Sequence, residues 1–476
     1  MKRYLILGAS GALFTIVLSL IFSDLFQSWE LKTLDTRFLL RGSLPTHPDI
    51  IMVDVDDASS DVYGQWPWKR TVHADMVHLL KEEGVKVVVY DILFKHPGVA
   101  EDDAQLAQST ADAQNVMFPV AVEFSDSDRA TEDLPALPGG IAVPEGMDFP
   151  IVNRAIVPMP ALTDKVKALG HIATNRDRDG IIRRVPLFLR YRDQLLPSMS
   201  FRAVLDFLDV DLKAIAFNGN TLTLPQAKPP GESQAMDISI PIDRKGQMLI
   251  NFAGTWRDTF KHASFAAALK AGGKGQGEDL TGKLILVSNA LSGLDFKTIP
   301  FEKNFPGGGV HANIINTLLT RNFLWETSGT MNILVVLLVS LLIAIVFRDR
   351  FFWTKLGAVL GLIAVYGMLT VMFFNQGIVM PLVIPSLSVV FTALLVSTYQ
   401  VRIERKQKEM LIHEKQDLEG KLLEVSKNLD AKDRQMEAIR KSLEELGREM
   451  AEKNQQSEIS SEKIYQLEGK LETLSR

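Results

Sequence analysis

Four apolar segments constrain this chain more than any other feature of its sequence. The first covers residues 4–23, and three more lie close together at 331–347, 356–374 and 378–399. A helix needs about 20 apolar residues to cross the hydrocarbon core of a bilayer, and only 331–347 is near the lower limit. The pattern therefore predicts a membrane protein with four crossings rather than a soluble protein with four buried core helices.

Charged residues beside these segments predict their orientation. Basic residues lie at 2–3 before the first segment, at 348–355 after the second and at 402–408 after the last, whereas the turn at 375–377 carries no charge. Because basic residues favour the cytoplasmic side, we expect both termini in the cytoplasm and residues 27–328 outside it. The first segment ends without a small-residue cleavage site, which favours an uncleaved anchor.

The chain is also too long for one hydrophobic core, which usually stops growing at about 250–300 residues. We expect four parts: residues 1–26 as the cytoplasmic start and first transmembrane helix, 27–328 as an extracytoplasmic domain, 329–400 as three transmembrane helices, and 401–476 as a cytoplasmic coiled coil. A net charge of -5 gives no general attraction to nucleic acid, and the lack of cysteine excludes disulfides and thiolate chemistry.

The outer part alternates between short β-branched runs and helical spacing, which predicts an α/β domain with a mixed sheet and flanking helices. We expect helices at 70–83 and from 101, a surface loop at 126–149 and a Gly-Lys-rich linker at 272–277. The expected strands are 50–55, 85–90, 116–122, 182–191, 247–252 and 284–288.

Polar side chains follow two of these strands. Asp56 comes after the first strand and Asp91 after the second, and Arg70 starts the helix between them. Ligands bind outside the carboxyl ends of strands in open α/β sheets. If the two strands are adjacent and parallel, these three residues would share one crevice as a ligand site; a purely structural ion-pair network is the alternative.

Two further groups suggest ligand binding. Trp66 and Trp68 flank a proline just before Arg70 and could offer an aromatic and guanidinium surface, or simply pack a loop onto the core. The mixed-charge run at 176–184 could contact an anion, although a solvated turn with a hairpin is its simpler interpretation.

The aspartates at the end of the first strand could hold a hard cation, but Asp54, Asp56, Asp57 and Asp61 fit no EF-hand spacing and suit a strand end and a helix cap better. His311 could be a pH-sensitive group. We find no metal-ligand spacing, cofactor motif or catalytic motif, and so predict no metal, no cofactor and no enzyme activity.

From residue 411 a seven-residue apolar repeat continues to the end, which predicts a parallel left-handed coiled coil rather than one amphipathic helix on the membrane. His413 lacks the sequence context of a phosphorylated kinase histidine, and no ATP-binding region follows. The residues predicted to mediate oligomerisation are Leu422, Leu429, Met436, Leu443, Met450, Ile464 and Leu471.

Several short segments, taken in order, make the chain resemble the CHASE2 family of bacterial extracytoplasmic sensory domains. The main ones are 34–38 (LDTRF), 53–57 (VDVDD), 66–70 (WPWKR), 90–94 (YDILF), 170–172 (GHI), 179–187 (DGIIRRVPL), 250–254 (INFAG) and 309–313 (GVHAN). Residues 288–290 (SNA) depart from the pattern, because a glycine-containing turn is expected there.

The resemblance implies a sensor in the inner membrane of a bacterium, with its sensory domain in the periplasm. We expect a homodimer or larger homo-oligomer that responds to an unknown extracytoplasmic ligand, contacts membrane lipid and joins or recruits a cytoplasmic output protein. The alternative is an oligomeric membrane scaffold that does not sense.

Overall fold

The computed structural model describes residues 2–125, 140–272, 279–291, 295–347 and 352–475. Most of the predicted loop at 126–149, most of the linker at 272–277 and the basic residues 348 and 350 lie outside the described residues. The chain divides into two compact units, Met1–Ala393 and Leu394–Arg476, and each is described by itself.

A ten-stranded mixed sheet forms the centre of the first unit, as the sequence predicts. Neighbouring strands are parallel from β15 to β3, whereas β3 pairs with β5, β9 with β10, and β10 with β4 in antiparallel fashion. The order is β15 (Lys261–Ser264), β1 (Ile50–Val55), β16 (Leu284–Asn289), β2 (Val87–Asp91), β3 (Val116–Ser125), β5 (Ile151–Ile156), β9 (Phe188–Tyr191), β10 (Gln194–Pro197) and β4 (Ile141–Ala142), with β6 (Ala168–His171) pairing in parallel with β3.

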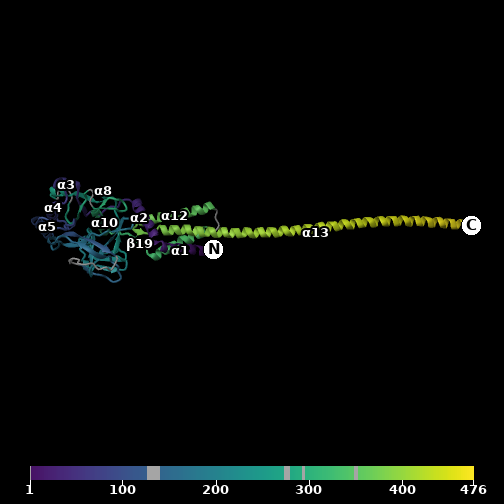
Figure 1. The fold of residues 1–476 in the computed structure, drawn as a ribbon, viewed down its shortest axis with the longest axis horizontal. Coiled ribbons are helices and arrows are strands. Elements are labelled where there is room, and N and C mark those ends of the chain that lie inside the picture. The colour runs from purple at the N-terminus through teal and green to yellow at the C-terminus, as the bar shows by residue number, and fades with distance from the viewer. Residues whose placement is uncertain (1, 126–139, 273–278, 292–294, 348–351, 476) are drawn as a thin grey trace. The chain divides into compact units, whose positions relative to one another are not determined.

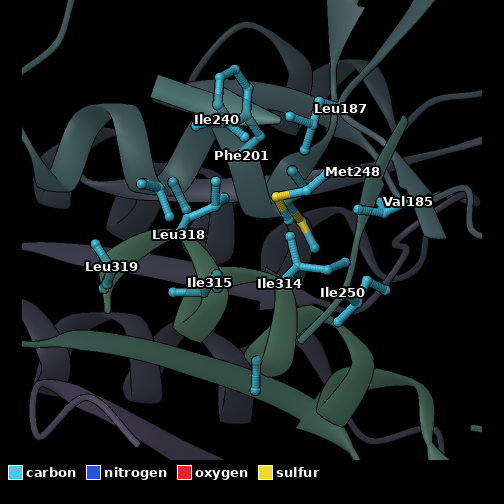
Figure 2. Close-up of a cluster of buried hydrophobic side chains, with 14 of the residues drawn as sticks. Val185, Leu187, Phe201, Ile240, Met248, Ile250, Ile314, Ile315, Leu318 and Leu319 are labelled. Carbon is cyan, nitrogen blue, oxygen red and sulfur yellow. The ribbon is translucent and has the colours of Figure 1, made fainter. Parts of the chain in front are cut away.

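The central strands are continuous apolar runs because helices cover both faces of the sheet. In β1, Ile50 and Met52 point into one core while Ile51 and Val53 point into the other. The first core also contains α2 (Ser23–Arg41), α7 (Met199–Phe207) and α10 (Gly307–Leu319). Figure 2 shows Ile314 and Leu318 of this cluster beside Met248 and Phe201.

The second core lies on the opposite face of the sheet. It contains side chains from α4 (Arg70–Glu82), α5 (Ala100–Ala113), α6 (Pro160–Thr163) and α9 (Phe265–Lys270). Helices α4 and α5 pack side by side (Figure 1). The short helix α3 (Asp57–Tyr63) packs on α9. The predicted helices at 70–83 and from 101 are therefore confirmed within one residue.

Smaller elements complete the domain. The predicted strand at 182–191 is two strands, because the chain moves from one sheet to another at Leu187, and the strand predicted at 247–252 ends at Leu249. One three-stranded sheet is β14 (Gln247–Leu249), β8 (Ile182–Pro186) and β7 (Asn175–Arg176), and another is β11 (Ala216–Asn218), β12 (Thr221–Ala227) and β13 (Met236–Pro241). The rest are η1 (Leu212–Ala214), α8 (Trp256–Thr259), β17 (Phe296–Lys297) and β18 (Phe305–Pro306).

Among the described residues, four helices are long and apolar enough to cross a membrane, as predicted: α1 (Lys2–Ile21), α11 (Gly329–Val346), α12 (Phe352–Asn375) and α13 (Val383–Leu474). The last begins five residues later than the predicted segment at 378. Gly377 has a φ of 83°, and Ile378–Val379 forms the short strand β20, which pairs with β19 (Trp325–Glu326). This turn keeps the chain extended until after Pro381.

Candidate functional site

A row of polar side chains crosses the carboxyl ends of the parallel strands. Asp54 of β1 pairs in register with Ser264 of β15 and with Ser288 of β16, and Ser288 pairs with Asp91 of β2. In β1, β16 and β2 the apolar residue two positions earlier faces the core that contains α10. The row therefore lies at the edge of the sheet where parallel α/β domains bind ligands.

Asp91 occupies this edge as predicted, but its partners differ from the predicted set. Strands β1 and β2 are parallel but not adjacent, because β16, which comes much later in the chain, lies between them. The carboxylate of Asp91 lies 4.0 Å from Nε2 of His311 on α10, and Nδ1 of His311 lies 2.8 Å from the hydroxyl of Ser200. Burial raises the pKa of Asp91.

The first turn of α10 closes over the row. A Cβ atom at Gly308 would overlap the side chain of Ser288, so only glycine permits this approach. The Ser288 hydroxyl is fully buried and has no hydrogen-bond partner among the described residues. The departure from the family pattern at 288–290 therefore places a polar group under the helix, and β16 ends at Asn289, whose side chain accepts a hydrogen bond from the Leu291 amide.

Asp54 has a histidine partner that the sequence analysis missed. Its Oδ2 lies 2.8 Å from Nδ1 of His262, and Nε2 of His262 lies 3.0 Å from the Trp256 carbonyl oxygen. Burial raises the pKa of Asp54, and its Oδ1 has no hydrogen-bond partner within the described part of the chain. Parallel pairing of His262 opposite Met52 explains this contact, and strand order cannot be read from spacing along the chain.

Asp56 is a helix cap. Its Oδ1 accepts hydrogen bonds from the Ser59 amide at 2.9 Å and from the Ser264 hydroxyl at 3.0 Å, which is the arrangement expected at the first residue before α3. Among the described residues, no group of three or more His, Asp or Glu side chains could hold a metal ion. Asp56 therefore acts as the N-cap of α3.

Trp66, Trp68 and Arg70 come together, but on the other face of the sheet from the row. The two indoles are 5.2 Å apart, and Trp68 is 4% exposed and stacked on His73. The Arg70 guanidinium lies 4.6 Å from the centre of the Phe94 ring. These contacts favour the packed-loop interpretation for Trp68, so the predicted constellation of Arg70 with Asp91 is not formed.

A second polar site lies on α2, beside the end of the first apolar helix. The side chain of Arg183 on β8 is 1% exposed, and its guanidinium donates to three carboxylates. The distances are 2.6 and 2.7 Å to Asp35 of α2, 2.7 Å to Asp177, and 2.8 and 3.0 Å to Asp179. The predicted hairpin is present as β7 and β8, but Arg183 is buried rather than solvated, because Asp35 covers it.

These contacts shift the pKa of Arg183 and of Asp179 in opposite directions. Burial alone would lower the pKa of Arg183, but the hydrogen bonds to Asp35, Asp179 and Asp177 outweigh it and raise the pKa. The hydrogen bond from Arg183 in turn lowers the pKa of Asp179. All five N–H donors of the guanidinium are used, so the group is fully satisfied. We call Arg183 with its three carboxylates the Arg183 clamp.

The same helix contacts the beginning of α13. Oε1 and Oε2 of Glu30 accept hydrogen bonds from the amides of Leu382 at 2.8 Å and Val383 at 2.9 Å, so Glu30 satisfies free N–H groups at that helix start. Arg37, whose pKa burial lowers, donates to Glu30 at 2.8 Å and to the Met380 carbonyl oxygen at 2.7 Å. We call Glu30 and Arg37 the α13 anchor.

The far end of α2 is tied to the sheet domain. Arg41 donates to the Asn251 side chain at 2.5 Å and to the Phe252 carbonyl oxygen at 2.6 Å. Phe38 packs edge-on against Phe374 of α12 with ring centres 5.0 Å apart. One helix therefore contacts both the core of the domain and the apolar helices.

A comparison with known families bears on the whole region from α1 to α11. The family model of the CHASE2 domain matches residues 12–345, which is more than half of the chain. The chain belongs to the CHASE2 family. Members of this family are extracellular sensory domains. No curated protein and no solved structure matches the chain.

The CHASE2 match includes α2, so the clamp and the anchor lie within the family domain. Sequence reasoning named neither Glu30 nor Asp35 as functional, and it considered Arg183 only as part of the run at 176–184 that could contact an anion. The available signal was weak: the helix pattern put Glu30 and Arg37 seven residues apart, on one face, in a segment that follows an apolar helix. Charged residues that share one helix face after an apolar segment are therefore candidates for functional contacts.

Proposed function

We propose that this CHASE2 protein is a transmembrane signal-transduction receptor. Its sensory domain lies in the periplasm, α1, α11, α12 and the first part of α13 cross the bacterial inner membrane, and both termini are cytoplasmic. The observation that carries the proposal is the position of α2. The Arg183 clamp holds this helix to the sensory domain, and the α13 anchor holds it to the helix that continues to Leu474.

A sensory change can act through α2 only if it alters these contacts. A ligand shifts a receptor by binding one of its states more tightly than the other. The polar row at Asp54, Ser288 and Asp91 supports a ligand site, because it combines unpartnered buried polar atoms with the carboxyl edge of a parallel sheet. The residues Asp56, Trp66, Trp68 and Arg70 remain low-ranking candidates by comparison.

The heptad repeat of the second unit supports a coiled coil as the output element of the receptor. In the second unit the heptad positions Leu422, Leu429 and Leu443 are 73, 61 and 64% exposed in a single chain. An apolar stripe of this length needs a partner surface, and membrane anchors at one end favour a parallel second copy. We propose a homodimer or larger homo-oligomer without a catalytic centre of its own, which joins or recruits a cytoplasmic output protein and does not bind nucleic acid.

Cysteine crosslinking of the full chain in nanodiscs tests the relay. Because the chain has no cysteine, single cysteines at positions 422, 429, 436 and 443 report only on contacts between copies of α13. Glu30→Ala removes the anchor, and Glu123→Ala removes an exposed carboxylate of the same domain as a matched control. We expect the crosslinking pattern to change in the first variant and to match the unmodified chain in the second.

Two results would count against the receptor. Crosslinks that stay the same in Glu30→Ala and in Arg183→Met would show that α13 does not respond to α2. A stable assembly whose mass is the same with and without these two substitutions would favour the scaffold alternative. If crosslinks do not form at any of the four positions, the parallel coiled coil itself is wrong.

A further inference from the structure

A polar cavity lies between α2 and the β7–β8 hairpin, and Asp177 and Asp179 of the Arg183 clamp line part of it. Its volume is about 440 Å³. Asp24, Ser28 and Lys32 line one wall, at the four-residue spacing that places side chains on one face of a helix. Arg176 and Arg178 line the opposite wall.

The position of the cavity is that of a lipid headgroup. The apolar helix α1 ends at Ile21, and α2 begins at Ser23. Leu25 and Trp29 of α2 are 46 and 42% exposed, and an exposed tryptophan beside a membrane span is typical of the membrane–water interface. From Asp24 to Lys32 the helix rises by about 12 Å, so the cavity extends outward from the level where the hydrocarbon ends.

The charges in the cavity select its ligand. Arg178 pairs with Asp24 at 2.6 Å, and Arg183 neutralises part of the charge on Asp177 and Asp179. Lys32 and Arg176 have no ion pair or side-chain hydrogen bond among the described residues. Two cations without partners in a cavity suit a phosphate, whereas the nearby carboxylates disfavour a ligand with several phosphates.

We propose that this cavity binds the phosphodiester of a phospholipid headgroup from the leaflet next to the CHASE2 domain, with Lys32 and Arg176 as its cationic contacts. A headgroup with a single negative charge and an amino group fits best, because Asp24 and Asp177 can accept hydrogen bonds from the amine. Binding requires only that α1 spans the membrane and does not depend on sensing. The bound lipid would brace the hairpin that carries the Arg183 clamp.

The test uses the full chain, delipidated in detergent and titrated with short-chain phosphatidylethanolamine, with bound lipid counted by native mass spectrometry. The variant is Lys32→Gln with Arg176→Gln. The control is Lys69→Gln with Lys95→Gln, which removes the same charge from exposed lysines outside the cavity. Each charged contact is worth about tenfold in Kd, so we expect clearly weaker binding in the variant and unchanged binding in the control.

A conservative variant tests whether the protein still folds, and competition experiments identify the source of the phosphate. Lys32→Arg with Arg176→Lys should keep both the affinity and the Tm of the unmodified chain. Diacylglycerol, which lacks a phosphate, should not compete for the cavity. Equal loss in the variant and the control, or binding of diacylglycerol, would refute the site. Displacement by glycerol phosphate as strong as by the lipid would show that a soluble phosphate, and not a membrane lipid, is the ligand.

Discussion

Replacement of Arg183 by methionine should destabilise the CHASE2 domain more than any surface change in it. The side chain is 1% exposed and makes five hydrogen bonds to Asp35, Asp177 and Asp179. Methionine fills similar space but leaves three carboxylates without their cation. The loss is therefore one of charge pairing, with only a small change in packing.

The magnitude follows from the burial of the partners. Removal of one member of a buried ion pair costs about 3–5 kcal/mol. The three carboxylates are 16, 19 and 30% exposed, so water compensates for part of this loss. We therefore expect about 3 kcal/mol, which corresponds to a fall of about 5 °C in Tm for a domain of about 300 residues.

The assay is thermal unfolding of the full chain in nanodiscs, followed by the fluorescence of its tryptophans. Arg154→Met is the control, because Arg154 is 68% exposed and pairs only loosely with Glu123 at 3.7 Å. An exposed pair of this kind is worth about 0–1 kcal/mol. Combination of Arg183→Met with Asp35→Asn should cost less than the sum of the two single changes, because both remove the same contact.

The dependence on pH gives an independent check. The folded-state pKa of Asp179 is lowered below its usual 3.8, mainly by its hydrogen bond from Arg183. Its contribution is therefore present above pH 3.8 and is lost as the pH falls through the folded pKa. Arg183→Met should lose this acid sensitivity. A Tm within 2 °C of the unmodified chain, or strictly additive effects with Asp35→Asn, would refute the clamp.

Three further predictions concern other parts of the chain. Burial lowers the pKa of His171 from 6.5 to about 3, so the folded protein loses stability as the pH falls below 6.5. This loss should reach about 2 kcal/mol between pH 6.5 and pH 5, and His171→Leu should abolish it. The measurement is Tm against pH, and equal slopes for the variant and the unmodified chain would contradict the prediction. Gly308→Ala should lower the stability by about 1–3 kcal/mol, because its Cβ overlaps the side chain of Ser288. Addition of Ser288→Gly to this variant should restore the Tm, and a Tm that stays low would show that the overlap with Ser288 is not the cause. Leu429→Lys should lower the mass of the nanodisc-embedded assembly in light scattering, whereas an unchanged mass would place the association outside α13.

Local pattern was sufficient for the central strands β1, β2, β3 and β16 and for helices α4 and α5, but it did not predict strands β15, β5, β6, β10 and β4. The strand at Ile50–Val55 was predicted to the residue, because an apolar run buried on both faces has few alternatives. The break at Leu187 and the late start of α13 were missed. Both depend on pairing with distant segments, Gly246 in the first case and Trp325 in the second. Spacing along the chain carries no information about such pairing.

The candidate site was predictable only in part, for the same reason. The carboxyl edge at Asp91 follows from the strand, helix, strand pattern. Its histidine partner does not, because the chain inserts β16 between β1 and β2 and brings α10 over the edge. The resemblance to CHASE2 supplied the family but not the roles of Arg183 or Glu30. Their roles become visible only when α2 is placed between its partners.

The geometry of α2 explains why one helix can serve both contacts. Each residue turns a helix by about 100°, so Glu30 and Arg37 lie about 20° apart around the axis and share one face. Asp35 lies five residues from Glu30, about 140° around the helix and about 7.5 Å along it. The CHASE2 domain thus holds one side of α2 through Arg183, and the start of α13 rests against the other.

This arrangement limits how the helix can move. If α2 rotates or slides away from Arg183, the carboxylate of Glu30 must move with it, because a helix transmits displacement along its backbone hydrogen bonds. The amides of Leu382 and Val383 would then lose their acceptor or follow it. Apolar contacts would allow a continuous range of positions, whereas a set of short charged hydrogen bonds is either made or broken. In the proposed receptor, a shift of about one ångström at α2 would therefore be enough to break these hydrogen bonds at the start of α13.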